Sequence, residues 1–223
     1  MTPSAFSWAL FNQAPIVGIV RKLSMAEVKA ILPLYQDAGL TTIEITMNTP
    51  DAGRMIRYAL DHHRTGAPAD GLNVGAGTVC TMDDLERALM AGAQFIVTPI
   101  INEPVIQACV ERGVPIMPGA FTPSEIYRAW TLGASLVKVF PATSLGPAYI
   151  SDLKAPLSQI KLLPTGGITL DNLTDFLNAG ADGVGVGSQL FDKTLIREQN
   201  WTGLRAHFRQ FVDQLATTTA PTN

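Results

Sequence analysis

Two oppositely charged residues lie inside segments that are otherwise made of strand-forming residues. Lys138 is the centre of residues 136–140 (LVKVF), and Glu44 is the centre of residues 42–46 (TIEIT). A strand covered on both faces rarely contains a charge unless that charge is paired or takes part in chemistry. Burial would lower the pKa of the Lys138 ammonium group and free the amine to form an imine with a ketone. Glu44 has two compatible interpretations, a structural partner for Lys138 or a general acid and base beside the imine.

Two further charges lie at the ends of predicted strands. Arg21 follows the strand predicted over residues 15–20, at its carboxyl end, where barrel enzymes build their active sites. It could bind a substrate carboxylate or phosphate there, and a surface loop arginine is the alternative. Lys161 opens a predicted strand at its amino end, so we expect it to be a solvated lysine at the opposite face.

Glycine-rich turns follow the last two predicted strands. Gly166 and Gly167 in one turn, and Gly187 with Ser188 in the other, occupy corresponding places in successive units. Glycine lets a ligand approach the backbone closely, and barrels commonly bind phosphate at these loops. The alternative is that the glycines only form tight turns, but their recurrence favours a phosphate site. Thr78, after another glycine pair, could bind a carboxylate or keto oxygen.

Residues that commonly bind metals are scattered along the sequence. Cys80 and Cys109 lack the spacing of a disulfide or a zinc site, and Cys80 has no evident histidine partner. We therefore interpret Cys80 as a packed thiol. The three histidines fall in predicted helices or loops, whereas a catalytic metal would need ligands at strand ends. This pattern favours lysine chemistry over metal chemistry.

Short apolar segments alternate with amphipathic segments along the chain, which is typical of repeated βα units. The predicted strands cover residues 15–20, 42–47, 73–79, 95–99, 116–120, 136–141, 161–167 and 183–188. Predicted helices include residues 25–38, 82–91 and 171–179, with caps at Ser24, Thr81 and Thr122 and small Ala/Gly pairs at several helix ends. Eight strands predict a closed (β/α)8 TIM barrel of the α/β class, and an open doubly wound sheet is the alternative.

The length of 223 residues predicts one domain over residues 1–223. Residues 1–14 form a predicted N-terminal helical extension, in which a helix over residues 6–11 covers one barrel end, and residues 217–223 are expected to be a mobile tail. A net charge of −3 and the lack of a Lys/Arg run predict no nucleic-acid partner. The sequence has no signal-peptide pattern and no apolar run of membrane-spanning length, which predicts a cytoplasmic protein with no membrane partner.

These residues together resemble a family of small class I pyruvate aldolases, which act on 2-keto-3-deoxy-6-phosphogluconate and 2-keto-3-deoxy-6-phosphogalactonate. The similarity extends from about Pro15 to Phe191. Its marks are IEIT (43–46), GAGTV (75–79), VTP (97–99), MPG (117–119), KVFPA (138–142), PTGG (164–167) and GS (187–188).

The resemblance implies a Schiff-base aldolase in which Lys138 forms the imine and Glu44 carries protons. It implies that Thr78 contacts the pyruvate carboxylate. The other substrate-binding residues that it implies are Pro99, Phe140, Gly166, Gly167, Gly187 and Ser188. Members of the family are typically homotrimers that use neither a metal nor an organic cofactor, so the implied partners are a small phosphorylated keto acid and two copies of the chain.

The substrate stereochemistry rests on a few positions. Many phosphogluconate enzymes have an arginine after the second strand, where this sequence has Asn48, whereas Arg21 resembles the phosphogalactonate type. Thr165 instead resembles the phosphogluconate type. We favour cleavage of the galactonate epimer to pyruvate and glyceraldehyde 3-phosphate, with Arg21 on the carboxylate and the gluconate epimer second. The rival functions are another phosphate-binding barrel enzyme, such as an epimerase or thiamine-phosphate synthase, and a non-catalytic sugar-phosphate sensor.

Overall fold

The computed structural model describes residues 5–62 and 71–216, so the first four residues and the predicted tail over 217–223 lie outside the described residues. Its strands pair in parallel throughout. The strands are β1 (Ile16–Val20), β2 (Thr42–Thr46), β3 (Asn73–Gly77), β4 (Ile96–Val97), β5 (Ile116–Met117), β6 (Gly119–Ala120), β7 (Val137–Val139), β8 (Leu162–Pro164) and β9 (Val184–Val186).

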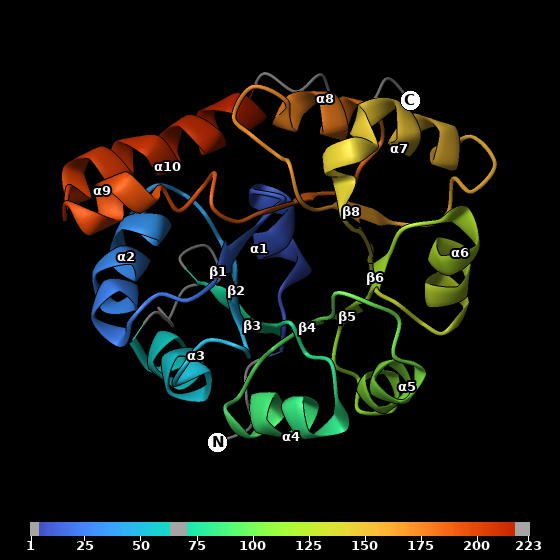
Figure 1. Ribbon diagram of the computed structural model, residues 1–223, viewed down its shortest axis with the longest axis horizontal. Coiled ribbons are helices and arrows are strands. Elements are labelled where there is room, and N and C mark those ends of the chain that lie inside the picture. Colours follow the sequence, from blue (N-terminus) through green and yellow to red (C-terminus); the bar gives the residue numbers. More distant parts are fainter. Residues whose placement is uncertain (1–4, 63–70, 217–223) are drawn as a thin grey trace.

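Helices surround these strands as a ring, and α1 lies over the middle of the ring (Figure 1). The helices are α1 (Trp8–Gln13), α2 (Met25–Asp37), α3 (Ala52–His62), α4 (Met82–Met90), α5 (Glu103–Glu111), α6 (Pro123–Thr131), α7 (Gly146–Lys154), α8 (Leu173–Asn178), α9 (Lys193–Arg197) and α10 (Trp201–Leu215), with a 3-10 turn η1 (Ala142–Ser144).

The strands close into a barrel. One set has the order β5-β4-β3-β2-β1-β9 and the other has the order β6-β7-β8. β5 and β6 belong to the single strand predicted over residues 116–120, which is interrupted at Pro118 because proline has no N–H to donate. The Pro118 carbonyl still accepts a hydrogen bond from the Lys138 N–H at 2.9 Å, so the segment joins both sets. A parallel bridge between Thr165 and Gly185 closes the other seam, so the (β/α)8 barrel is confirmed and the open-sheet alternative is wrong.

Side chains of the strands alternate between the barrel interior and the helices. In the β7 region, Val137 and Val139 pack in the large apolar layer that contacts the helices, whereas Leu136 belongs to a separate interior cluster. Successive strand residues point to opposite faces, so Lys138 shares the interior face with Leu136. The backbone alternation thus directs the Lys138 amine into the barrel.

Helix α1 closes the amino-terminal end of the barrel. Phe6 and Phe11 pack with Phe95 and other interior residues, and the rings of Phe6 and Phe95 meet edge to face at 5.2 Å. The side chain of Asn73, at the start of β3, accepts from the Ser7 N–H at 2.8 Å and donates to the Ser7 carbonyl at 2.9 Å. The helix therefore occupies the end opposite to the carboxyl ends of the strands.

The predicted helix ends are confirmed at several places. Ser24, Thr81 and Thr122 each form a capping box with the acidic residue three positions later. The glycines that follow α2, α4, α6 and α8 take the left-handed conformation, with φ between 93° and 101°. Most strands are shorter than predicted, and several of them end at or just before a glycine or proline, which turns the chain out of the ladder.

No helix within residues 5–62 and 71–216 is long and apolar enough to cross a membrane.

Candidate active site

A cavity of about 640 Å³ opens among the carboxyl ends of the strands. Seven of the predicted site residues line it, and they come from turns after β1, β8 and β9 and from the β7 region. These residues are Arg21, Lys138, Phe140, Gly166, Gly167, Gly187 and Ser188. Residues that are more than 160 positions apart in the sequence thus face the same space.

Lys138 reaches the cavity from inside the barrel. Lys138 is 4% exposed, and its Nζ lies 4.9 Å from the centre of the Phe140 ring. Burial lowers the pKa of Lys138, the nearby Glu44 carboxylate opposes that shift, and Arg21 adds to it. The amine is therefore closer to its neutral, nucleophilic form than an exposed lysine.

Glu44 is the most deeply buried acidic side chain near the cavity. It is 1% exposed, and its Oε1 has no hydrogen-bond partner within the described residues. Burial raises the pKa of Glu44, whereas the positive charges of Lys138 and Arg21 lower it. Gly77 faces this carboxylate, since a Cβ atom at that position would lie only 2.6 Å from the Glu44 Cδ. A raised pKa makes this carboxylate a stronger base than an exposed one, which suits a group that accepts and returns protons.

Arg21 lies at the mouth of the cavity, where its side chain is exposed. The next residue, Lys22, adopts the left-handed conformation with φ of 57°. Its N–H donates to Thr49 Oγ1 at 3.0 Å, and that hydroxyl lies 2.9 Å from Thr46 Oγ1. Thr46 and Thr49 are both buried, so the turn that carries Arg21 is tied to the end of β2.

The glycine turns have the geometry that the sequence suggested. Gly166 and Gly167 have φ of 93° and 75°, a conformation that other residues rarely adopt. A Cβ atom on Gly167 would lie 2.8 Å from the Thr143 backbone, so the turn packs closely against η1. Gly187 and Ser188 line the same cavity from the end of β9.

Thr78 and Pro99 do not line this cavity, nor does the buried Glu44. Thr78 and Pro99 lie just past the carboxyl ends of β3 and β4, on the same side of the barrel as the cavity. Thr78 is partly buried and has a left-handed φ of 55°, which is uncommon for a β-branched residue. The Pro99 carbonyl packs where a Cβ atom on Gly119 would lie. Strained backbone of this kind is often found at functional sites.

Several residues that line the cavity were not among the predicted site residues, notably Lys22, Thr165, Lys193 and Arg197. Thr165 precedes the glycine pair and faces inward, with its hydroxyl donating to the Leu163 carbonyl at 3.2 Å. Its place beside the glycine motif was a signal in the sequence. Lys193 and Arg197 lie in α9, after the last predicted strand, and carry no local motif.

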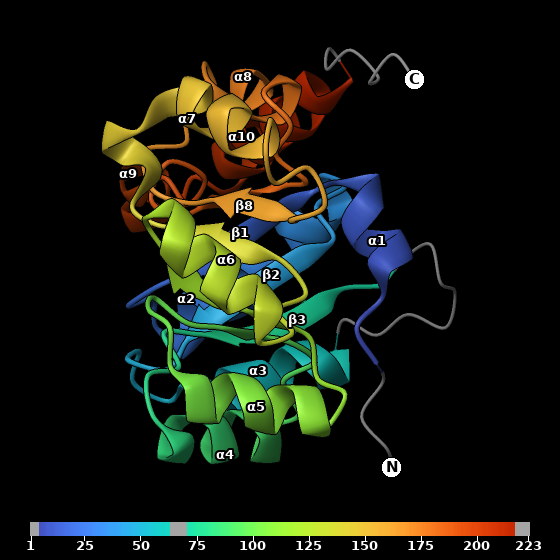
Figure 2. The same ribbon diagram turned by 90° about the vertical axis from the view of Figure 1, so that its right-hand side faces the viewer.

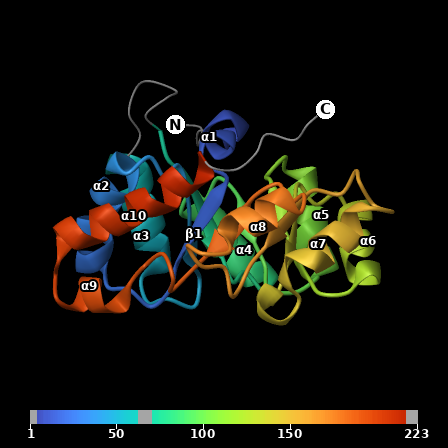
Figure 3. The ribbon, with the colours of Figure 1, turned by 90° about the horizontal axis from the view of Figure 1, so that it is seen from above.

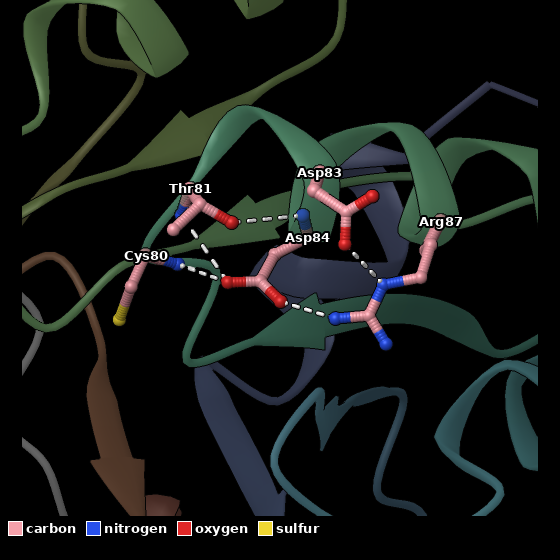
Figure 4. A network of polar contacts seen from close by, with 5 residues as sticks. All are labelled: Cys80, Thr81, Asp83, Asp84 and Arg87. Atoms are coloured by element: carbon pink, nitrogen blue, oxygen red, sulfur yellow. Dashed lines mark hydrogen bonds and ion pairs between the residues drawn. The ribbon is translucent and has the colours of Figure 1, made fainter.

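Cys80 lies at the start of α4. Its N–H donates to Asp84 Oδ2 at 3.1 Å, and Asp84 also bonds the Thr81 N–H and pairs with Arg87 (Figure 4). The sulfur points away from this network. Burial and the Asp84 charge raise the pKa of the Cys80 thiol, while Lys138 lowers it. A raised pKa reduces the thiolate fraction, in agreement with our interpretation of a packed thiol.

Lys161 confirms the contrast between the two barrel ends. It is exposed at the amino end, and its Nζ lies 5.5 Å from the centre of the Trp8 ring in α1. Across the described ranges, no group of three or more His, Cys, Asp or Glu residues could hold a metal ion.

Comparisons with known proteins agree with this arrangement. The family model for KDPG and KHG aldolase matches residues 9–206. The 2-dehydro-3-deoxy-6-phosphogalactonate aldolase of Escherichia coli (strain K12) is 36% identical over 181 residues, which cover 81% of this chain and 86% of the relative. The 2-dehydro-3-deoxy-phosphogluconate aldolase of Treponema pallidum (strain Nichols) is also 36% identical, over 172 residues that cover 75% of this chain and 79% of the relative.

A solved native KDPGal structure has the same fold, with a TM-score of 0.82 and 32% identity. The alignment covers 92% of this chain and 95% of that structure. The family match, the relatives and the shared fold lead to one conclusion: this chain belongs to the KDPG and KHG aldolase family and is a class I aldolase.

Proposed function

We propose that this aldolase cleaves 2-dehydro-3-deoxy-6-phosphogalactonate to pyruvate and glyceraldehyde 3-phosphate. The observation that carries the proposal is the buried Lys138 amine, which faces a cavity lined by Arg21 and by two glycine turns. A keto acid that bears a phosphate has one group for each of these features: a ketone for the amine, a carboxylate for the arginine and a phosphate for the glycine N–H groups.

The reaction begins at the C2 ketone of the substrate. The neutral Lys138 amine adds to this carbon, and the resulting carbinolamine takes up a proton at its hydroxyl, delivered through the Glu44 carboxyl group or water, and loses water to give a protonated imine. The imine nitrogen withdraws electrons from C3, so the C3–C4 bond can break with its electron pair moving to C3 as an enamine forms. The lowered pKa of Lys138 supplies the neutral amine that the first step needs.

Glu44 moves the protons. Its carboxylate takes the proton from the C4 hydroxyl as the C3–C4 bond breaks, which releases glyceraldehyde 3-phosphate. The same carboxyl group returns a proton to C3 of the enamine, and water then hydrolyses the imine to pyruvate and the free amine. Oε1 of Glu44 has no partner within the described residues, so it is free to accept that proton.

The remaining residues position the two halves of the substrate. The N–H groups of Gly166, Gly167 and Gly187 and the hydroxyl of Ser188 bind the phosphate. Thr78, Pro99 and Phe140 surround the pyruvate half, with Thr78 as a contact to the carboxylate. The proposed role of Phe140 is supported by its ring, whose centre lies 4.9 Å from Lys138 Nζ.

The preference for the galactonate epimer depends on the charge at the mouth. Arg21 lines the cavity, whereas Asn48 is exposed and does not line it. Thr165 also faces the cavity, and it favours the gluconate epimer as the second candidate. The relatives with the two activities are equally identical to this chain, at 36%. Kinetics with both C4 epimers will therefore decide between them.

The lysine mechanism has a direct test. Borohydride added in the presence of pyruvate should reduce the imine and add a stable mass to the chain, located at Lys138 by peptide mapping. A Lys138→Ala variant is the control and should gain no mass. An epimerase-like enzyme or a sugar-phosphate sensor needs no imine, so a wild-type protein without an adduct would contradict the proposed function. An assay that couples pyruvate release to a dehydrogenase then measures cleavage of each epimer.

We also propose that the enzyme works in the cytoplasm as a homotrimer. Free thiols at Cys80 and Cys109 support a reducing compartment. Exposed apolar side chains on α4, α5 and α6 and on the loops before them support a contact between subunits. These side chains are Met82, Met90, Ile100, Val110, Phe121 and Tyr127.

A further inference from the structure

Two cations on α9 face the cavity but have no part in the reaction described above. Lys193 and Arg197 are the first and last residues of this helix, and residues four positions apart lie on the same helical face. Both line the cavity that also contains Lys138, Gly187 and Ser188. Figure 2 and Figure 3 place α9 and α1 at opposite ends of the barrel, and the cavity opens at the end where α9 lies.

The charges of these two residues are only partly neutralised by the carboxylates around them. Glu27 is the one carboxylate among the residues that line the cavity, and its Oε2 is bonded to the N–H and hydroxyl of Ser24 at 2.6 and 2.7 Å. The neighbouring Asp192 carboxylate accepts the N–H groups that begin α9. Arg197 pairs with the exposed Glu198 at 3.4 Å, and Lys193 forms no ion pair within residues 5–62 and 71–216.

This arrangement has an energetic cost in the unliganded protein. Like charges four residues apart on a helix repel each other. Arg21 and Lys22, in the turn after the neighbouring strand β1, add further positive charge to the same cavity. An anion bound among these cations would remove the repulsion, and a phosphate dianion carries the most negative charge of any group in the proposed substrate.

We propose that Lys193 and Arg197, which we name the α9 cation pair, bind the substrate phosphate from the solvent side. The glycine N–H groups and Ser188 hold the same phosphate from the barrel side. This inference rests on the proposed function and deepens it, because it assigns the discrimination between phosphorylated and unphosphorylated substrates to charged side chains. Uncharged N–H donors alone would give weaker long-range attraction and less dependence on salt.

The test compares the wild-type enzyme with the double variant Lys193→Ala/Arg197→Ala. Exposed charge contacts each contribute about two- to fivefold to binding, so KM for the phosphorylated substrate should rise about tenfold while kcat stays within about twofold. KM for the unphosphorylated 2-dehydro-3-deoxy sugar acid should not change. The control Lys161→Ala/Arg205→Ala removes the same charge at exposed sites outside the cavity and should behave as wild type.

Salt provides a second readout. KM of the wild-type enzyme for the phosphorylated substrate should rise with ionic strength, and the rise should be smaller in the double variant. Inorganic phosphate should inhibit the wild-type enzyme more strongly than the double variant. Thermal unfolding of both variants verifies that they are folded. If the alanine double variant is not folded, Lys193→Gln/Arg197→Gln replaces it in the same measurements.

The outcomes separate the inference from the proposed function. A wild-type enzyme that cleaves neither C4 epimer would overturn the proposed function itself. A wild-type enzyme that cleaves the phosphorylated substrate, with KM unchanged in the double variant, would overturn only the role of the α9 cation pair. An equal rise in KM for phosphorylated and unphosphorylated substrates would also overturn it, because the pair would then act on another part of the substrate.

Discussion

Burial and charge act in opposite directions on the two central residues. Burial favours the neutral forms of both Lys138 and Glu44, whereas their mutual attraction favours the charged forms. In both residues burial is the larger influence. The pair therefore titrates as a unit, and a change in one residue should move the titration of the other.

We predict that Glu44→Gln lowers the pKa of Lys138 further. The carboxylate stabilises the ammonium form, so its removal leaves burial less opposed. The rate of imine formation rises with pH as the amine loses its proton, and its midpoint should therefore move to lower pH in the variant. The rate of adduct formation with pyruvate and cyanoborohydride, followed by mass spectrometry across pH, measures this shift.

The same variant should keep the imine and lose turnover. Removal of a general acid and base typically slows a reaction by about two to four powers of ten. Glu86→Gln, which changes an exposed carboxylate outside the barrel, is the control. A midpoint that stays or moves to higher pH, or cleavage at the wild-type rate, would exclude the role that we give to Glu44.

Gly77 offers a way to displace the carboxylate without removing it. We predict that Gly77→Ala lowers kcat, because the new Cβ would lie 2.6 Å from the Glu44 Cδ. Gly75→Ala is a matched control on the same strand: Gly75 lies beside Glu44 in the β2–β3 ladder, but its Cβ would press against the Phe95 ring at 2.5 Å and not against the carboxylate. Both variants should lose about 1–3 kcal/mol of unfolding free energy through overpacking. Thermal unfolding and kcat, measured together, distinguish them, and an equal loss of kcat would contradict the prediction.

At the scale of elements, the turn between β1 and α2 depends on a strand to which it is not joined. The left-handed Lys22 is fixed by its N–H bond to Thr49, and Thr49 contacts Thr46 at the end of β2. This connection orients the neighbouring Arg21 toward the cavity. A hydroxyl 27 residues further along the chain, just after the next strand, thus holds the turn that carries Arg21, the charge that we propose binds the substrate carboxylate.

We predict that Thr49→Val raises KM about three- to tenfold with little change in kcat, because one hydrogen bond to the turn and one to Thr46 are lost. Thr49→Ser keeps the hydroxyl and should restore the wild-type KM. Steady-state kinetics on the phosphorylated substrate measure the effect. If the serine variant were as impaired as the valine variant, the methyl group rather than the hydroxyl would be responsible.

The elements themselves were largely predictable from local chemistry. A capping box needs only a Ser or Thr followed three residues later by an acidic residue, which is a local pattern. Ser24, Thr81 and Thr122 could therefore be predicted as helix caps. The interruption at Pro118 and the bond from Lys22 to Thr49 depend on which strands meet in space. Such contacts join distant segments, and periodicity carries no information about them.

At the scale of the whole molecule, the count of strands predicted the closed barrel, and the place of Lys138 at the centre of an apolar strand predicted a buried amine. The membership of the cavity was harder to predict. Lys193 and Arg197 reach it because α9 follows the last strand and lies at the barrel end opposite to α1 (Figure 3). Thr78 and Pro99 were expected in the site, but they do not line the cavity.

The proposed trimer belongs to this scale as well. Tyr127 on α6 is 51% exposed, and α4, α5 and the loops before these helices carry further exposed apolar side chains. These three helices form one side of the ring (Figure 1). We predict that Tyr127→Glu lowers the molar mass measured by light scattering, because a charge is unfavourable at the core of an interface.

Thr202→Glu on α10 is the control for this prediction, since it places the same charge on another exposed helix and should leave the mass unchanged. A wild-type protein that elutes as a monomer would contradict the trimer. A Tyr127→Glu variant that keeps the wild-type mass would place the contact on another face.

The aromatic seal that α1 makes with Phe6, Phe11 and Phe95 has a consequence for traffic through the enzyme. With that end of the barrel filled, substrate enters and both products depart by the same mouth. In the reaction proposed above, the phosphorylated aldehyde would lie nearer to this mouth, while the pyruvate fragment would stay covalently attached to the buried Lys138. We therefore expect the aldehyde to leave before pyruvate, through the open end of the barrel.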